Sequence, residues 1–110
     1  MGLTAVYAET EPARAQINAL EEATVIEFGS PDCGHCSAAQ PLIAQAFAGH
    51  PDVAHIKIED GRGRRLGRSF AVKLWPTLIF LRQGKEVERL VRPSDSSTIE
   101  EALRQIDVSP

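Results

Sequence analysis

The chain has 110 residues, 43% of them hydrophobic and 25% charged, with a formal net charge of −3. This length and composition suit one globular domain over residues 1–110 with a core of its own. The slight excess of acidic residues argues against a nucleic-acid or anionic-membrane partner, and no stretch reaches the ~20 apolar residues of a membrane span. Residues 1–20 lack the basic and apolar runs of a secretory signal, so we expect a cytoplasmic protein. We also expect a monomer.

The hydrophobic pattern predicts strands that alternate with helices, ending in an antiparallel hairpin and a last helix. Strands are expected at 3–7, 23–29, 52–58, 77–81 and 86–92. Helices are expected after a cap at Thr10, after the two cysteines as far as Gly49, within 61–72, and after a capping box from Ser97 to Glu100. The order β-α-β-α-β-α-β-β-α predicts an α/β fold with a central mixed five-stranded sheet, covered on both faces by four helices.

Both cysteines lie in "SPDCGHCSAAQP", residues 30–41, with only Gly34 and His35 between them. Cys33 is expected at the N-terminus of a helix, where unpaired N–H groups and the helix dipole favour the thiolate. Cys36 lies one turn further on, close enough to attack a mixed disulfide formed at Cys33. His35 adds a donor, or a positive charge when protonated, near the Cys33 sulfur. The pair therefore suits thiol-disulfide exchange.

Two other interpretations of the cysteine pair stay open at this point. The pair could be two inert core residues, or half of a zinc site, which usually needs four ligands. Only His35, His50 and His55 are available as further ligands of the usual nitrogen type, and none has the usual ligand spacing. The position of the pair, between a buried strand and a helix, favours the redox interpretation.

A longer segment around the cysteines, "VIEFGSPDCGHCSAAQPLIAQAF", closely resembles the active-site segment of the thioredoxin superfamily. Its CGHC tetrapeptide is the version typical of protein disulfide isomerase domains, where most thioredoxins have CGPC. Pro41 matches the proline at which the family kinks its active-site helix. "FAVKLWPTLIFLRQGKEV" looks like the family's segment around its cis-proline and the following hairpin. The resemblance covers about residues 23–107 and implies a thioredoxin fold.

The resemblance also implies roles for two charged residues on the predicted strands. Glu27 stands in an apolar run, where burying a charge is costly, so burial should favour its protonated form. It matches the family's buried acid, which accepts the proton of Cys36. Lys57 matches a lysine that similar domains place near this acid. The alternatives are a Glu27 side chain that reaches solvent at an edge and a Lys57 that is simply solvated.

The substrate groove is expected around Trp75, Pro76 and Thr77. By resemblance Pro76 is the cis-proline beside the sulfurs, and Trp75 lines the groove, although a partly buried core tryptophan is an equal alternative. Asp32 stands where the family usually has an aromatic residue. Its carboxylate should oppose the Cys33 thiolate, but the helix dipole and His35 should prevail because Asp32 is expected to be exposed and screened. We expect Asp32 to alter partners without stopping exchange.

The resemblance implies a thiol-disulfide oxidoreductase that reduces or exchanges protein disulfides through Cys33 and Cys36. No metal and no organic cofactor is required, the substrate is a disulfide-containing protein, and electrons come from a separate reductase. Two alternatives of other classes remain. One is a non-enzymatic adaptor or chaperone-like module that binds a client protein, and the other is a carrier of a metal or an iron–sulfur cluster.

Overall fold

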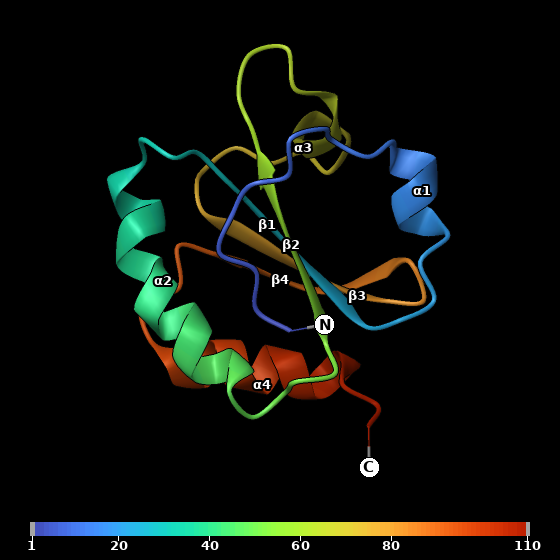
Figure 1. The fold of residues 1–110 in the computed structure, drawn as a ribbon, viewed down its shortest axis with the longest axis vertical. Coiled ribbons are helices and arrows are strands. Elements are labelled where there is room, and N and C mark those ends of the chain that lie inside the picture. Colours follow the sequence, from blue (N-terminus) through green and yellow to red (C-terminus); the bar gives the residue numbers. More distant parts are fainter. Residues whose placement is uncertain (1, 110) are drawn as a thin grey trace.

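A computed structural model describes residues 2–109 of the chain and shows an α/β fold (Figure 1). No helix of this part of the chain is long and apolar enough to cross a membrane. The strands and helices follow the predicted order from the first helix onwards. They are α1 (Arg14–Asn18), β1 (Thr24–Gly29), α2 (Gly34–Phe47), β2 (Ala54–Glu59), α3 (Arg65–Ser69), β3 (Thr77–Arg82), β4 (Lys85–Val91) and α4 (Ser96–Ile106).

The strands form one mixed sheet in the order β2-β1-β3-β4. The central strand β1 is parallel to β2 and antiparallel to β3, and all six of its residues are buried, as its apolar sequence predicts. β3 and β4 form the predicted hairpin, whose turn residues Gln83 and Gly84 both have positive φ angles of 51° and 76°. This is the backbone that a two-residue hairpin turn requires.

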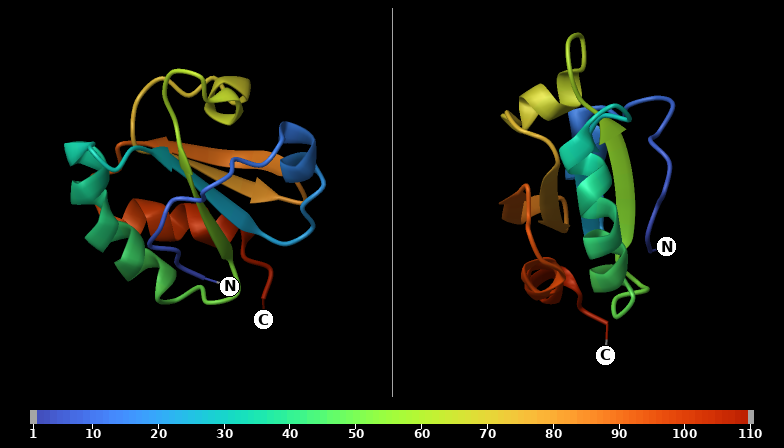
Figure 2. Two further views of the ribbon diagram at one scale, coloured as in Figure 1. Left: turned by 45° about the horizontal axis from the view of Figure 1, so that its top comes forward. Right: turned by 90° about the vertical axis from the view of Figure 1, so that its left-hand side faces the viewer.

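Helices cover both faces of the sheet, which separates the core into two groups of side chains. In the left view of Figure 2, α1 and α3 lie above the strands and α4 lies below them. α2 and α4 bury Ile43, Phe47, Ile99 and Leu103 against one face, while Ile17 and Leu66 from α1 and α3 pack on the other. Successive residues of a strand belong to the two groups in turn, because their side chains point to opposite faces of the sheet.

The predicted fifth strand at residues 3–7 is wrong. Among the described residues, the stretch 2–7 makes only two isolated parallel bridges to β2, Gly2 with Ala54 and Tyr7 with Lys57. The reason lies at Thr4, whose N–H donates to His55 Nδ1 (2.8 Å) and whose hydroxyl donates to the His55 carbonyl (2.6 Å). Side-chain groups thus take the hydrogen bonds that a continuous ladder would need, and the sheet in this part of the chain has four strands.

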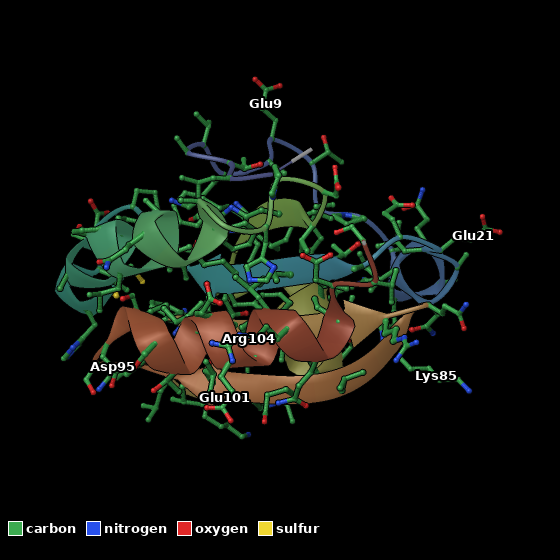
Figure 3. The ribbon with its side chains drawn as sticks, turned by 90° about the horizontal axis from the view of Figure 1, so that it is seen from below. Glu9, Glu21, Lys85, Asp95, Glu101 and Arg104 are labelled. Carbon is green, nitrogen blue, oxygen red and sulfur yellow. The ribbon has the colours of Figure 1, made fainter. Side chains whose placement is uncertain are left out.

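Two predicted helix caps are also wrong. The first helix begins after Ala13 rather than Thr10, because the Gln16 side chain accepts the Ala13 N–H (2.8 Å). The last helix begins after Asp95 rather than Ser97, because the Asp95 carboxylate accepts the Thr98 N–H (2.8 Å). Figure 3 shows Asp95 at the start of α4, with Glu101 and Arg104 on the outer side of the helix.

Candidate active site

Cys33 and Cys36 lie at the junction between β1 and α2. After β1 a turn is closed by the Cys33 N–H, which donates to the Ser30 carbonyl (3.2 Å), and Cys33 then forms the N-cap of α2. The Cys36 N–H donates to Cys33 Sγ (3.2 Å), so a free N–H of the first helical turn is aimed at this sulfur. Both thiols are free; Cys33 is half-buried and Cys36 is 2% exposed. Cys33 is therefore the sulfur that a substrate can reach.

The environment of Cys36 disfavours its thiolate. Burial raises its pKa from the ordinary 9.0 to about 11, and a hydrogen bond with Cys33 and the nearby negative charges of Cys33 and Glu27 add to the rise. A backbone hydrogen bond from Ser30 acts in the opposite direction. Cys36 consequently holds its proton at neutral pH and must lose it before it can attack a disulfide.

Gly29 lets the start of α2 approach the end of β1. A Cβ atom at this position would lie 2.6 Å from Cys36 Sγ and 2.9 Å from the Tyr7 hydroxyl, closer than non-bonded atoms normally come. A side chain here would displace the buried thiol. In contrast, a Cβ added at Gly34 would have no atom within 4 Å, so Gly34 fits without any steric demand for glycine.

Glu27 is fully buried on β1, so the alternative of an edge residue in solvent does not apply. Its Oε1 is 2.9 Å from His55 Nε2, and its Oε2 accepts a hydrogen bond from Gln40 Nε2 (2.8 Å). Lys57 Nζ lies 4.0 Å from the same oxygen and donates to Gln40 Oε1 (3.2 Å). The carboxylate thus sits in a polar cluster contributed by β1, β2 and α2.

Strand register explains why this cluster forms. In the parallel β1–β2 ladder Glu27 is paired with Lys57 and Val25 with His55, so these side chains share one face of the sheet. His55 Nδ1 accepts the Thr4 N–H, which places the ring proton on Nε2, directed at Glu27. His55 is therefore a neutral donor to the buried carboxylate. Sequence reasoning missed His55 as a site residue, although its alternation with Lys57 on the strand was a usable signal.

Tyr7 and Gln40 are the other site residues that the sequence did not predict. Tyr7 is half-buried, and Lys57 Nζ lies 4.6 Å from the centre of its ring. Burial, then the charges of Cys36 and Glu27 and a hydrogen bond to Cys36, raise the pKa of the Tyr7 hydroxyl well above its ordinary value. An open pocket of about 150 Å³ lies beside these groups. It is lined by Tyr7, Ser30, Pro31, Cys36, Ser37, Gln40 and Lys57.

Thr77 is the first residue of β3, and Trp75 and Pro76 precede it. β3 begins at the sheet end from which the chain enters α2 (Figure 1). The Trp75–Pro76 peptide bond is cis. Pro76 and Thr77 are buried, and Thr77 pairs with Phe28 of β1. Trp75 is half-buried and its Nε1–H donates to Asp60 Oδ2 (2.9 Å), so this ring is anchored rather than free.

The polar residues beside the cysteines are exposed. The Asp32 side chain reaches solvent, and its N–H donates to Ser30 Oγ (3.3 Å). His35 lies exposed on the first turn of α2, and within residues 2–109 no hydrogen bond or ion pair joins it to Cys33. An action of His35 on the Cys33 sulfur therefore stays a prediction.

No group of three or more His, Cys, Asp and Glu side chains that could hold a metal ion is found in the described part of the chain. Two of the three histidines contact carboxylates. His50 Nδ1 lies 2.5 Å from Asp107 Oδ2, and His55 contacts Glu27. His50 and His55 thus each face a carboxylate.

Comparison with known proteins adds several similarities. The family model described as Thioredoxin matches residues 5–105. The solved structure of thioredoxin 2 from Pseudomonas aeruginosa PAO1 in its reduced form is 53% identical, with a TM-score of 0.84, covering 94% of this chain and 96% of that chain. The thioredoxin of Chlamydia trachomatis serovar D is 32% identical over 75 residues, which are 68% of this chain and 74% of that protein.

Human protein disulfide-isomerase A2 is 36% identical over 89 residues, which cover 76% of this chain but 17% of that protein. The chain also matches plant thioredoxins of the H type from Nicotiana tabacum, Oryza sativa and Arabidopsis thaliana. It spans 53% to 59% of the length of these three relatives.

Proposed function

This chain belongs to the thioredoxin family, and on that premise we propose that it is a thiol-disulfide oxidoreductase that reduces or exchanges disulfides in other proteins. One observation carries the proposal. Cys33 caps α2 with a helical N–H aimed at its sulfur, while Cys36 is held one turn further on, nearly out of contact with solvent. One thiol is thus presented to a substrate and the other is reserved for the second step.

In the proposed reaction the Cys33 thiolate attacks one sulfur of a substrate disulfide. The substrate S–S bond breaks, a Cys33–substrate disulfide forms, and the first substrate sulfur leaves as a thiolate that takes up a proton. Cys36 then loses its proton and attacks Cys33 Sγ, which releases the second substrate sulfur. Two electrons have passed to the substrate, and the chain holds a Cys33–Cys36 disulfide.

The geometry of Glu27 supports a part in the second step. In the proposed mechanism its carboxylate accepts the proton of Cys36 through water, as the buried acid of the family does. Its negative charge is near enough to Cys36 to contribute to the raised thiol pKa. His55 and Gln40 hold the two carboxylate oxygens in place, and the Lys57 ammonium balances the buried charge.

The substrate and partners follow from the same proposal. We infer a disulfide-containing protein as substrate and a separate reductase as electron donor, with no metal or organic cofactor. The similarity to human protein disulfide-isomerase A2 and the CGHC tetrapeptide support a protein substrate. The single-domain organisation, the monomeric state and the cytoplasmic location stay predictions, which gel filtration and cell fractionation would test.

A second candidate function is favoured by Asp32. It is exposed beside Cys33, where the family usually has an aromatic residue that helps to dock a substrate. A thioredoxin-fold module that holds a client without turning over its disulfide would tolerate this change. Client capture that persists when both cysteines are replaced by serine would favour this second function.

The test is reduction of insulin disulfides with dithiothreitol as electron source. We expect Cys33→Ser to abolish the reaction, because it removes the attacking sulfur. Cys36→Ser should instead accumulate mixed disulfides, since nothing resolves them. Gln45→Ala, a change to an exposed residue further along the same helix and outside the pocket beside Cys36, serves as the control and should keep full activity. Turnover by Cys33→Ser would overturn the mechanism.

A further inference from the structure

The N-terminal arm, defined here as residues 2–8, is fixed along the outer side of β2. It makes two bridges to β2, and further hydrogen bonds add to them. The Ala8 N–H donates to the Lys57 carbonyl (2.9 Å), and Thr4 makes its two hydrogen bonds to His55. Lys57 Nζ also donates to the Ala5 carbonyl (3.4 Å). In Figure 1 the arm runs in blue beside β2 before it reaches α1.

This attachment brings Tyr7 to the buried thiol. The Tyr7 hydroxyl and Cys36 Sγ both lie within 2.9 Å of the point where a Cβ of Gly29 would stand, so the two atoms lie close together beside that glycine. The tyrosine ring is held from its other side by Lys57, whose ammonium lies over the ring face. The hydroxyl is therefore positioned rather than free to swing into solvent.

We propose that Tyr7 is a catalytic residue of the second step, in which its hydroxyl donates a hydrogen bond to Cys36 Sγ as this sulfur becomes a thiolate. The proposal rests on the proposed function, in which Cys36 resolves the mixed disulfide. Tyr7 acts as a donor and not as a base, because its environment raises its own pKa and it keeps its proton.

The groups around Cys36 leave this task to Tyr7. The charged and titratable groups that face Cys36 are Cys33 on α2, Glu27 on β1 and Lys57 on β2. Cys33 and Glu27 oppose a thiolate, both oxygens of Glu27 already have donors, and the Lys57 ammonium donates to Gln40 and to the arm. Tyr7 and the Ser30 backbone remain as donors to the sulfur.

The proton balance of the step is simple. The Cys36 thiol proton passes to water in the pocket that Tyr7, Cys36, Gln40 and Lys57 line, and from there to Glu27 or to solvent. The Cys36 thiolate then forms the bond to Cys33 Sγ, and the substrate sulfur leaves with the electron pair of the broken S–S bond. Tyr7 gains and loses no proton, so its effect is to make the thiolate more populated.

The experiment follows the reduced protein after mixing with dithiobis(nitrobenzoate), a small disulfide that releases coloured thionitrobenzoate. Attack by Cys33 releases the first thionitrobenzoate in a phase that depends on reagent concentration. Attack by Cys36 on the mixed disulfide releases the second in a phase that does not. We expect Tyr7→Phe to leave the first phase unchanged and to slow the second about threefold. Loss of one hydrogen bond lowers the thiolate population about tenfold, but the less stabilised thiolate is more nucleophilic.

Tyr7→Phe keeps the ring over Lys57, and Val6→Ala, at an exposed position of the same arm, is the matched control. A second readout is the titration of Cys36 by thiolate absorbance in the Cys33→Ser background. There Tyr7→Phe should raise the pKa of Cys36 by about one unit, which a purely structural role would not do. Equal second phases in wild type and Tyr7→Phe would overturn the role of Tyr7. A wild type without any second phase would overturn the proposed function itself.

Discussion

Alkylation of the reduced protein by iodoacetamide at pH 7 should modify Cys33 long before Cys36. The reagent reacts with thiolates, and the pKa of Cys36 is raised from 9.0 to about 11, chiefly by burial. A rise of this size lowers the thiolate population about 100-fold, to about one molecule in 10⁴ at pH 7. Cys36 is also 2% exposed, whereas Cys33 is half-buried.

The assay follows the mass of the intact protein over time. Fragmentation of the peptide that contains both cysteines then locates the label. We expect a singly alkylated species labelled at Cys33 to accumulate, with Cys36 modified much more slowly because its thiol is buried and its pKa is raised. Comparable labelling of the two thiols, or labelling of Cys36 first, would refute the assignment of Cys33 as the attacking sulfur.

Replacement of Cys33 should change the pKa of Cys36. In Cys33→Ser the thiol hydrogen bond and the negative charge of Cys33, two causes of the raised Cys36 pKa, are lost. The pKa of Cys36 should fall below 11 but stay above 9.0, because burial is the largest cause and remains. A mixed disulfide at Cys33 removes the same charge, so Cys36 becomes easier to ionise once a substrate is attached.

Two further predictions concern stability. His55→Leu removes the donor to Glu27 Oε1 and leaves the Thr4 N–H without its acceptor. This change should lower the free energy of unfolding, measured in urea, by about 1–3 kcal/mol. An unchanged urea midpoint would contradict the role of His55. Gly84→Ala should cost clearly more than Gly63→Ala, although both glycines have positive φ. A Cβ at Gly84 would meet the Asn18 carbonyl oxygen, whereas at Gly63 nothing lies within 4 Å, so equal losses in thermal unfolding would refute this argument.

The sequence predicted the centre of the molecule well because the signals there are local. The apolar run of β1, the cysteines at the start of α2 and the hairpin of β3 and β4 each depend on neighbouring residues in the chain. The burial of Glu27 could be predicted for the same reason, since a lone carboxylate in a central strand has no route to solvent.

The residues that the sequence did not reveal are those whose role depends on distant contacts. His55 and Gln40 reach Glu27 only because β2 and α2 pack against β1 in one register. Tyr7 reaches Cys36 through the arm, which looked like a strand because a short apolar run carries the same pattern in either case. The misplaced cap at Ser97 has a local cause instead, since Asp95, two residues earlier, accepts the Thr98 N–H.

The arm has a consequence for how the protein behaves at high concentration. β2 and β4 are the two edges of the sheet, and an exposed flat edge is a template on which a second chain can add a strand. The arm covers the β2 edge, while β4 presents Glu86, Glu88 and Arg89 and carries an irregularity opposite Phe80 and Leu81. The segment that brings a hydroxyl to the buried thiol therefore also occupies an edge on which a second chain could add a strand.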